Sequence, residues 1–137
     1  MLVGFEQRKD LKMSRYSTTF TFKHQSGGNG FFAEVEIDIQ FADGERSMEI
    51  CYEDQENHRW KEAAIVGVRN AWRHVPAKFT AKSCAIVRII RIGWQPVETT
   101  DMTVVFAVAQ AVFLALEVQP REHPEFVQSY GAFLFPK

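Results

Sequence analysis

The sequence predicts an α+β domain of two layers, in which two helices cover one face of a mostly antiparallel sheet. Three observations lead to this fold. Residues 31–41 alternate strictly between apolar and polar side chains, which indicates a strand with one buried and one solvated face. Apolar residues recur at helical spacing in residues 60–73, and residues 99–117 form a second, more apolar helix. The economical arrangement packs both helices on the same side of one sheet.

The first half of the domain is expected to be three strands. Residues 16–23 are rich in Thr and Phe, which favour a strand. Residues 31–41 form the second strand, and its acidic side chains are expected to face water. Asp43 and Gly44 then supply a turn, and residues 47–53 form the third strand.

The second half adds a helix, a strand and another helix. The helix over residues 60–73 leads to a strand over residues 84–92 that carries apolar residues on both faces. The last helix is expected to start near Thr99 or Thr100, whose hydroxyls suit an N-cap, and to run to about Glu117.

The chain of 137 residues is long enough for one domain with a real core. Residues 1–15 are interpreted as an N-terminal arm and residues 16–118 as the domain. Residues 119–137 form a C-terminal tail with too many apolar groups to leave in water, so it packs either on the domain or on a partner.

Charge and composition exclude several classes of protein. The net charge is −1, so no global basic field indicates a nucleic-acid binder, although acids dominate residues 34–56 and bases dominate residues 59–91. The longest apolar run, residues 102–116, is too short to span a bilayer, and the N-terminus lacks an apolar signal core. We therefore expect a cytoplasmic protein without a membrane partner.

Catalytic and metal chemistry find little support in the sequence. Cys51 and Cys84 lie in apolar strand contexts without a CxxC motif, which favours buried, inert thiols. The histidines are scattered without the spacing of metal ligands, at His24, His58, His74 and His123. We expect no enzyme activity, no metal and no cofactor.

A glycine loop separates the first two strands. It reads Gln25-Ser26-Gly27-Gly28-Asn29-Gly30, and three glycines in four residues indicate either positive φ angles or the close approach of another group. That group could be a phosphate, a base or another loop.

Three segments in order resemble domain IV of translation elongation factor G. The first is the glycine loop (residues 25–30), followed by the long alternating strand. The second is the helix segment over residues 63–71 (AAIVGVRNA), and the third is a second loop, residues 93–98, that leads through Thr99-Thr100-Asp101 into the last helix. The resemblance covers roughly residues 16–118 and implies a left-handed βαβ crossover, although general rules favour the right hand.

In that family the domain is the arm that reaches the decoding region of the ribosome, and its tip is made of these two loops. The resemblance therefore implies contact with ribosomal or other structured RNA. The resemblance places this contact in residues 25–30 and 93–98, and Lys23 and His24 next to them could add a cationic rim. The candidate RNA-binding residues are Lys23, His24, Gln25, Gly27, Gly28, Asn29, Gly30, Trp94 and Gln95. Trp94 could stack on a base.

The chain departs from the family at two side chains of the tip. Asn29 stands where the family usually has arginine, and Gln95 stands where it has histidine. The chain also contains no GxxxxGK[ST] motif and has no room for a GTPase domain, so it is interpreted as a standalone, diverged relative. Arg88 and Arg91 either supply a cationic rim or pair across the sheet with Glu34, Glu36 or Asp38.

The alternative function is a protein-interaction or oligomerisation module that kept the fold and lost RNA binding. The last helix has two apolar faces, whereas a helix on a single sheet needs only one. The second face would be covered by the C-terminal tail or by another subunit in a homodimer. The residues of the two faces are Met102, Val105, Phe106, Ala109, Phe113 and Leu116 on one, and Val104, Val108, Ala111 and Ala115 on the other.

Overall fold

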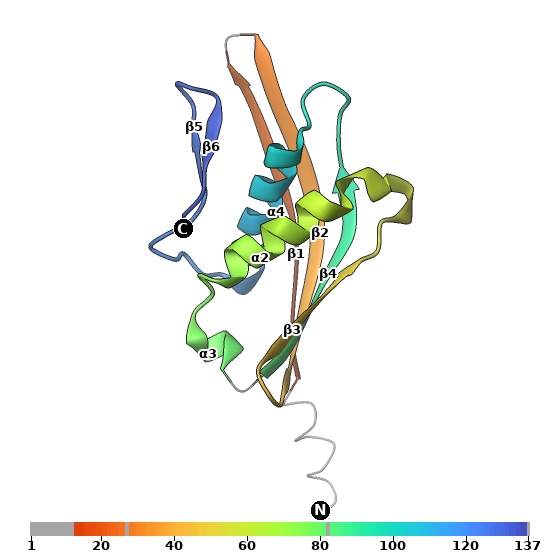
Figure 1. Cartoon of the computed structure of the whole chain (residues 1–137), viewed down its shortest axis with the longest axis vertical. Coiled ribbons are helices and arrows are strands. Elements are labelled where there is room, and N and C mark those ends of the chain that lie inside the picture. The colour runs from red at the N-terminus through yellow and green to blue at the C-terminus, as the bar shows by residue number, and fades with distance from the viewer. Residues whose placement is uncertain (1–12, 27, 82, 137) are drawn as a thin grey trace, which may run out of the picture.

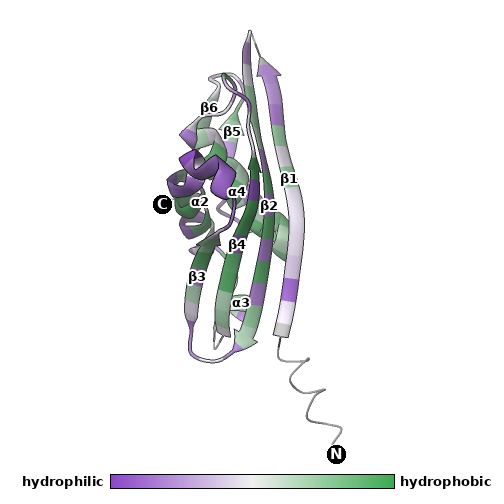
Figure 2. Cartoon of the chain, turned by 90° about the vertical axis from the view of Figure 1, so that its right-hand side faces the viewer, coloured by the Kyte–Doolittle hydropathy of each residue, from purple (hydrophilic) through white to green (hydrophobic). Residues whose placement is uncertain are grey.

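A computed structural model describes residues 13–26, 28–81 and 83–136 of the chain. It consists of a four-stranded sheet with two long helices on one face, and it confirms the predicted two-layer α+β fold (Figures 1 and 2). The elements are β1 (Met13–Ser26), β2 (Asn29–Asp43), β3 (Ser47–Tyr52), the 3-10 helix η1 (Gln55–Trp60), α2 (Lys61–Trp72), α3 (Ala77–Thr80), β4 (Ser83–Gly93), α4 (Asp101–Leu116), β5 (Glu125–Val127) and β6 (Ala132–Leu134).

The strands lie in the order β1-β2-β4-β3. β2 pairs antiparallel with both β1 and β4, whereas β3 and β4 are parallel neighbours joined through α2. Seen from the helix side with β3 pointing up, β4 lies to the left of β3, so this crossover is left-handed (Figures 1 and 2). The rare hand is the one that the resemblance to the elongation-factor domain implied.

The core lies between the sheet and the helices. The apolar residues of β2 point into it and are completely buried: Ala33, Val35, Ile37 and Ile39. α2 crosses α4 closely at Gly67, where a Cβ atom would lie 2.7 Å from the carbonyl oxygen of Val105. α4 contacts β1 and β2 on one side and α2 on another, which explains why it is apolar nearly all round.

The start of α4 confirms the expected N-cap. The Thr100 hydroxyl accepts a hydrogen bond from the backbone N–H of Thr103 at 3.2 Å, and Asp101 occupies the first turn. The helix ends where Glu117 adopts a left-handed conformation with φ of 55°.

Within the described residues, no helix combines the length and the apolar character that crossing a membrane requires.

The C-terminal tail packs on the domain, which is one of the two expected alternatives. Its β5–β6 hairpin, which the sequence did not predict, places Phe133 against Phe106 of α4 with ring centroids 4.9 Å apart. Phe126 packs against Phe22 of β1 at 5.2 Å.

At the other end of the chain β1 already begins at Met13, so residues 13–15 belong to the sheet rather than to an arm; the rest of the predicted arm lies outside the described residues.

The acidic face of β2 is not uniformly exposed, contrary to the expectation from its alternating pattern. Asp38 lies on the open face of the sheet, the face without helices, yet its side chain is only 1% exposed. Arg15 Nε and Ser17 Oγ of β1 donate hydrogen bonds to Asp38 Oδ1 at 2.8 and 2.6 Å. Burial alone would raise the pKa of Asp38, but these bonds and the charges of Arg15 and Arg88 lower it below its ordinary value.

We predict that Asp38→Asn lowers the free energy of unfolding by about 1–3 kcal/mol at pH 7, because Arg15 and Ser17 lose a charged acceptor. Since the folded-state pKa is depressed, the charged carboxylate contributes its full stability above the unfolded-state pKa of about 3.9. That contribution is lost as the pH falls from there through the folded-state pKa. Urea unfolding across this pH range measures the difference between variant and wild type.

The matched control is Glu49→Gln, which changes an exposed carboxylate on β3. It should alter stability by no more than about 0.5 kcal/mol. The difference in unfolding free energy between wild type and Asp38→Asn should shrink at acid pH. If it stays constant there, the charge of Asp38 does not have the assigned role.

Candidate functional site

The two loops singled out in the sequence lie at the same end of the sheet, at the top of Figure 1. The glycine loop is the turn between β1 and β2, and the second loop belongs to the connection between β4 and α4. Hydrogen bonds at Phe32 of β2, two residues after the glycine loop, join the hairpin to the second loop. Phe32 N–H donates to the carbonyl oxygen of Glu98 at 3.1 Å. The Thr99 hydroxyl donates to the carbonyl oxygen of Phe32 at 2.6 Å. We call this end of the molecule the tip.

Two positions of the glycine loop require glycine, each for a different structural reason. Gly28 has φ of 86°, a conformation that other residues rarely adopt, and a Cβ atom there would meet nothing within 4 Å. At Gly30 a Cβ atom would lie 2.8 Å from Cγ of Glu98. The group that approaches the glycine loop is therefore the second loop itself. Gly27 lies outside the described residues.

The predicted residues of β1 do not all face the same way. Lys23 and Gln25 are exposed on the open face, where they pair in register with Phe32 and Gly30 of β2. His24 points to the helix side and is half-buried, with its ring 4.8 Å from that of Phe126 in the C-terminal hairpin. Lys23 and His24 therefore do not share one surface, because neighbouring residues of a strand point to opposite faces.

Lys23 is a cation of the β1–β2 hairpin that forms no ion pair with any described residue. Arg91, by contrast, donates a hydrogen bond to Glu34 at 2.9 Å and forms an ion pair with Glu36 at 3.6 Å, which confirms the predicted pairing for Arg91. Arg88 instead pairs with Glu53 at 3.8 Å. The pKa of Glu34 is lowered by hydrogen bonds from Thr21 and from Arg91. Lys23 therefore keeps its charge available to a ligand, whereas the charge of Arg91 is used within the sheet.

Trp94 is held on the second loop by a chain of hydrogen bonds, anchored on a buried aspartate, that the sequence did not predict. Its indole N–H donates to Asn57 Oδ1 at 2.6 Å, and Asn57 Nδ2 donates to Asp54 Oδ2 at 2.9 Å. Asp54 is buried and also accepts the backbone N–H of Ile92 at 2.9 Å. The indole edge is thus fixed, while the Trp94 residue remains 45% exposed.

The Tyr52 hydroxyl donates to the carbonyl oxygen of Asn57 and so belongs to the same chain. Burial, followed by the charge of Asp54, raises the pKa of Tyr52 to about 12, so this hydroxyl remains a donor at neutral pH. Asn57 has non-helical angles, φ −121° and ψ 49°, inside η1. No residue pattern in the sequence predicts such a kink; the polar run of residues 54–59 indicates only an irregular segment.

A groove of about 380 Å³ opens beside Trp94, between η1 and the second loop. Arg59 lies on its wall with the guanidinium 4.3 Å above the ring of Trp60, and it bonds Asp101 at 2.8 Å. Gln95 is exposed next to the groove, and its backbone N–H donates to Thr99 Oγ1 at 2.9 Å. The lining residues are Glu56, Asn57, Arg59, Trp60, Trp94, Pro96 and Thr99.

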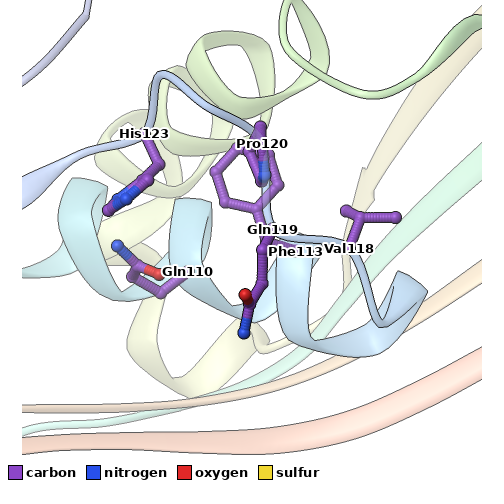
Figure 3. A pocket seen from close by; sticks show the side chains of 6 residues that line it. All are labelled: Gln110, Phe113, Val118, Gln119, Pro120 and His123. Atoms are coloured by element: carbon purple, nitrogen blue, oxygen red, sulfur yellow. The ribbon is translucent and has the colours of Figure 1, made fainter.

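Another hollow, of about 360 Å³, lies between α4 and the segment that follows it (Figure 3). Gln110 and His123 lie on one side of it, next to Phe113 and Pro120. The Gln110 amide donates to the carbonyl oxygen of Pro124 at 2.8 Å, and His123 Nδ1 lies 3.0 Å from the same oxygen. The Gln110 bond fastens the tail to α4, whereas the His123 contact lies within the tail, so the hollow marks where the tail packs on the helix.

Metal-binding side chains do not gather in the described part of the chain, where no three His, Cys, Asp or Glu residues form a cluster. Cys51 and Cys84 are both free and half-buried. The Cys84 thiol lies 3.3 Å from the carbonyl oxygen of Glu45 and takes part in packing at the β2–β3 turn.

Comparisons with known proteins support the fold alone. No protein-family model matches the chain, and no curated protein matches it. A crystal structure of a protein from Thermus thermophilus has a similar fold, with a TM-score of 0.59 and 16% sequence identity. The similarity covers 81% of this chain and 17% of that one, so the chain spans a small part of the length of this structural neighbour.

We predict that Thr99→Val destabilises the protein, because Thr99 is buried and its hydroxyl links Gln95 of the second loop to Phe32 of β2. Loss of the hydroxyl leaves the Phe32 carbonyl and the Gln95 N–H without this partner, which costs about 1–3 kcal/mol of unfolding free energy. Chemical denaturation measures this loss. Thr19→Val, at an exposed site of β1, is the control and should lie within about 0.5 kcal/mol of wild type. If the two variants have equal stability, the hydrogen bonds of the Thr99 hydroxyl do not stabilise the contact between the second loop and β2.

Proposed function

We propose that the protein is a non-catalytic binding module whose tip contacts structured RNA, with ribosomal RNA as the leading candidate. The observation that carries the proposal is the junction of the two loops. Two segments far apart in the sequence are joined at one end of the sheet by the hydrogen bonds between Phe32 and residues 98–99. This is the arrangement expected from the resemblance to domain IV of elongation factor G, the arm that reaches the decoding region.

The tip offers complementary groups for RNA. Lys23 supplies an ammonium for a phosphate, and Gln25 and Asn29 supply exposed amides for sugar or base edges. Gly28 leaves the backbone of the turn open to close approach, because beyond the glycine and its two chain neighbours no described atom lies within 4 Å of the position that a Cβ would take. Trp94 offers an exposed aromatic face for stacking. Such a module would act in the cytoplasm, where ribosomes are found.

A protein-interaction function is the second candidate, and it has its own support. Asn29 and Gln95 replace the arginine and the histidine of the family, which removes two strong RNA contacts. Val97 on the second loop is 83% exposed and could serve as an apolar anchor for a protein partner. Self-association through α4 and the tail, where Leu114 and Leu134 are exposed, belongs to this candidate, and light scattering at high concentration tests it.

We predict that Lys23→Glu weakens binding to ribosomes and to an RNA hairpin, and that it lowers the slope of log K against log salt by about 1. The reason is that one lysine–phosphate contact, with its released counterion, is lost. Filter binding over a series of salt concentrations measures both effects.

Arg46→Glu is the matched control, because it makes the same charge change at the β2–β3 turn, far from the tip. It should keep the wild-type slope. Binding that does not depend on salt, or equal losses in the two variants, would overturn the RNA function and leave the protein-interaction function.

A further inference from the structure

We infer that the groove between η1 and the second loop binds one unpaired nucleobase, stacked on the face of Trp94. The inference rests on the proposed function, since it assigns a ligand group to one part of the RNA-contacting tip. It adds a site that includes η1, an element for which the sequence indicated no role.

Trp94 is fixed before any ligand arrives. Its indole N–H is bound to Asn57, which is bound to Asp54, which in turn is bound to the backbone of β4 at Ile92. An exposed tryptophan on a loop normally has free rotamers, and ordering them on binding costs free energy. Here the bond to Asn57, which is anchored on the buried Asp54, already orients the ring and leaves the residue 45% exposed.

The charges around the groove favour a base over a phosphate. Among the described lining residues the only basic one is Arg59; it lies on Trp60 and already bonds Asp101 at 2.8 Å. Glu56 adds a carboxylate to the same lining. This balance disfavours a phosphate inside the groove, whereas a carboxylate can accept a hydrogen bond from the amino group of a base. We assign the phosphate contact to Lys23 on the β1–β2 hairpin instead.

The size and the walls of the groove suit a single base. A groove of about 380 Å³ lies in the lower part of the range of small-molecule sites, and it suits one base better than a stacked run. Its walls combine an aromatic face, a proline and a guanidinium plane, which are surfaces on which splayed-out bases stack. A base inside a continuous helix cannot enter, so the base must come from a bulge, a loop or a single strand.

A thermodynamic cycle tests the inference. The probes are an RNA hairpin with one bulged adenosine and the same hairpin with an abasic residue at the bulge. Wild type should bind the adenosine hairpin about tenfold more tightly than the abasic one, as expected for one base–aromatic stack. Trp94→Leu should lose that preference while binding the abasic hairpin as wild type does. Trp94→Phe, which keeps an aromatic face but loses the bond to Asn57, should keep part of it.

The matched control is Tyr130→Leu, which removes an aromatic side chain that is 83% exposed on the turn between β5 and β6. It should keep the full preference for the adenosine bulge. The wild-type comparison of the two hairpins needs no variant, so the test stands even if Trp94→Leu fails to fold.

The possible failures are distinguishable. If the hairpins bind with a salt dependence that Lys23→Glu reduces, but wild type does not distinguish adenosine from the abasic residue, the groove assignment is overturned and the proposed function stands. The groove assignment is also overturned if Trp94→Leu and the abasic change weaken binding independently. If neither hairpin binds, the proposed function and the groove assignment fall together.

Discussion

The main-chain bonds of Phe32 to residues 98–99 are the constraint on which the geometry of the tip depends. β4 pairs with β2 only as far as Glu34, opposite Gly93, whereas β1 and β2 continue together to Ser26 and Asn29. Beyond Glu34 the hairpin would be a two-stranded ribbon, which is at best marginally stable in water. Beyond this point the connection that follows β4 forms hydrogen bonds to the free edge of β2 at Phe32, and these bonds join the hairpin to the second loop.

The other side of the same hairpin rests on aromatic side chains. Phe31 packs against Phe126 and Phe133 of the C-terminal tail, with ring centroids 5.0 and 5.9 Å apart, and His24 joins this cluster. Gly131 lets the turn of the tail approach closely, since a Cβ atom there would lie 3.3 Å from Phe31. The tail therefore supports the hairpin from the helix side, while the second loop holds its edge. The proposed RNA contact would benefit from both supports, because rigid loops lose little entropy on binding.

The elements with a strong local signal could be predicted from the sequence. The alternation along β2 and the N-cap at Thr100 each depend on neighbouring residues, and both were confirmed. The burial of Asp38 could not be predicted, since only Arg15 and Ser17 on another strand account for it. His24 and Lys23 lie on opposite faces of the sheet because neighbouring residues of a strand point in opposite directions. The fastening of Trp94 by Asn57 and Asp54 depends on a kinked segment with no sequence signature.

The direct contact between Gly30 and Glu98 is the most specific consequence of this architecture, and nuclear Overhauser spectroscopy measures it without any substitution. The joined tip predicts strong cross-peaks between the α-protons of Gly30 and the γ-protons of Glu98, because a carbon added to Gly30 would lie 2.8 Å from Cγ. Spectra in which both residues are assigned and the core contacts of β2 are present, but these cross-peaks are missing, would contradict the joined tip.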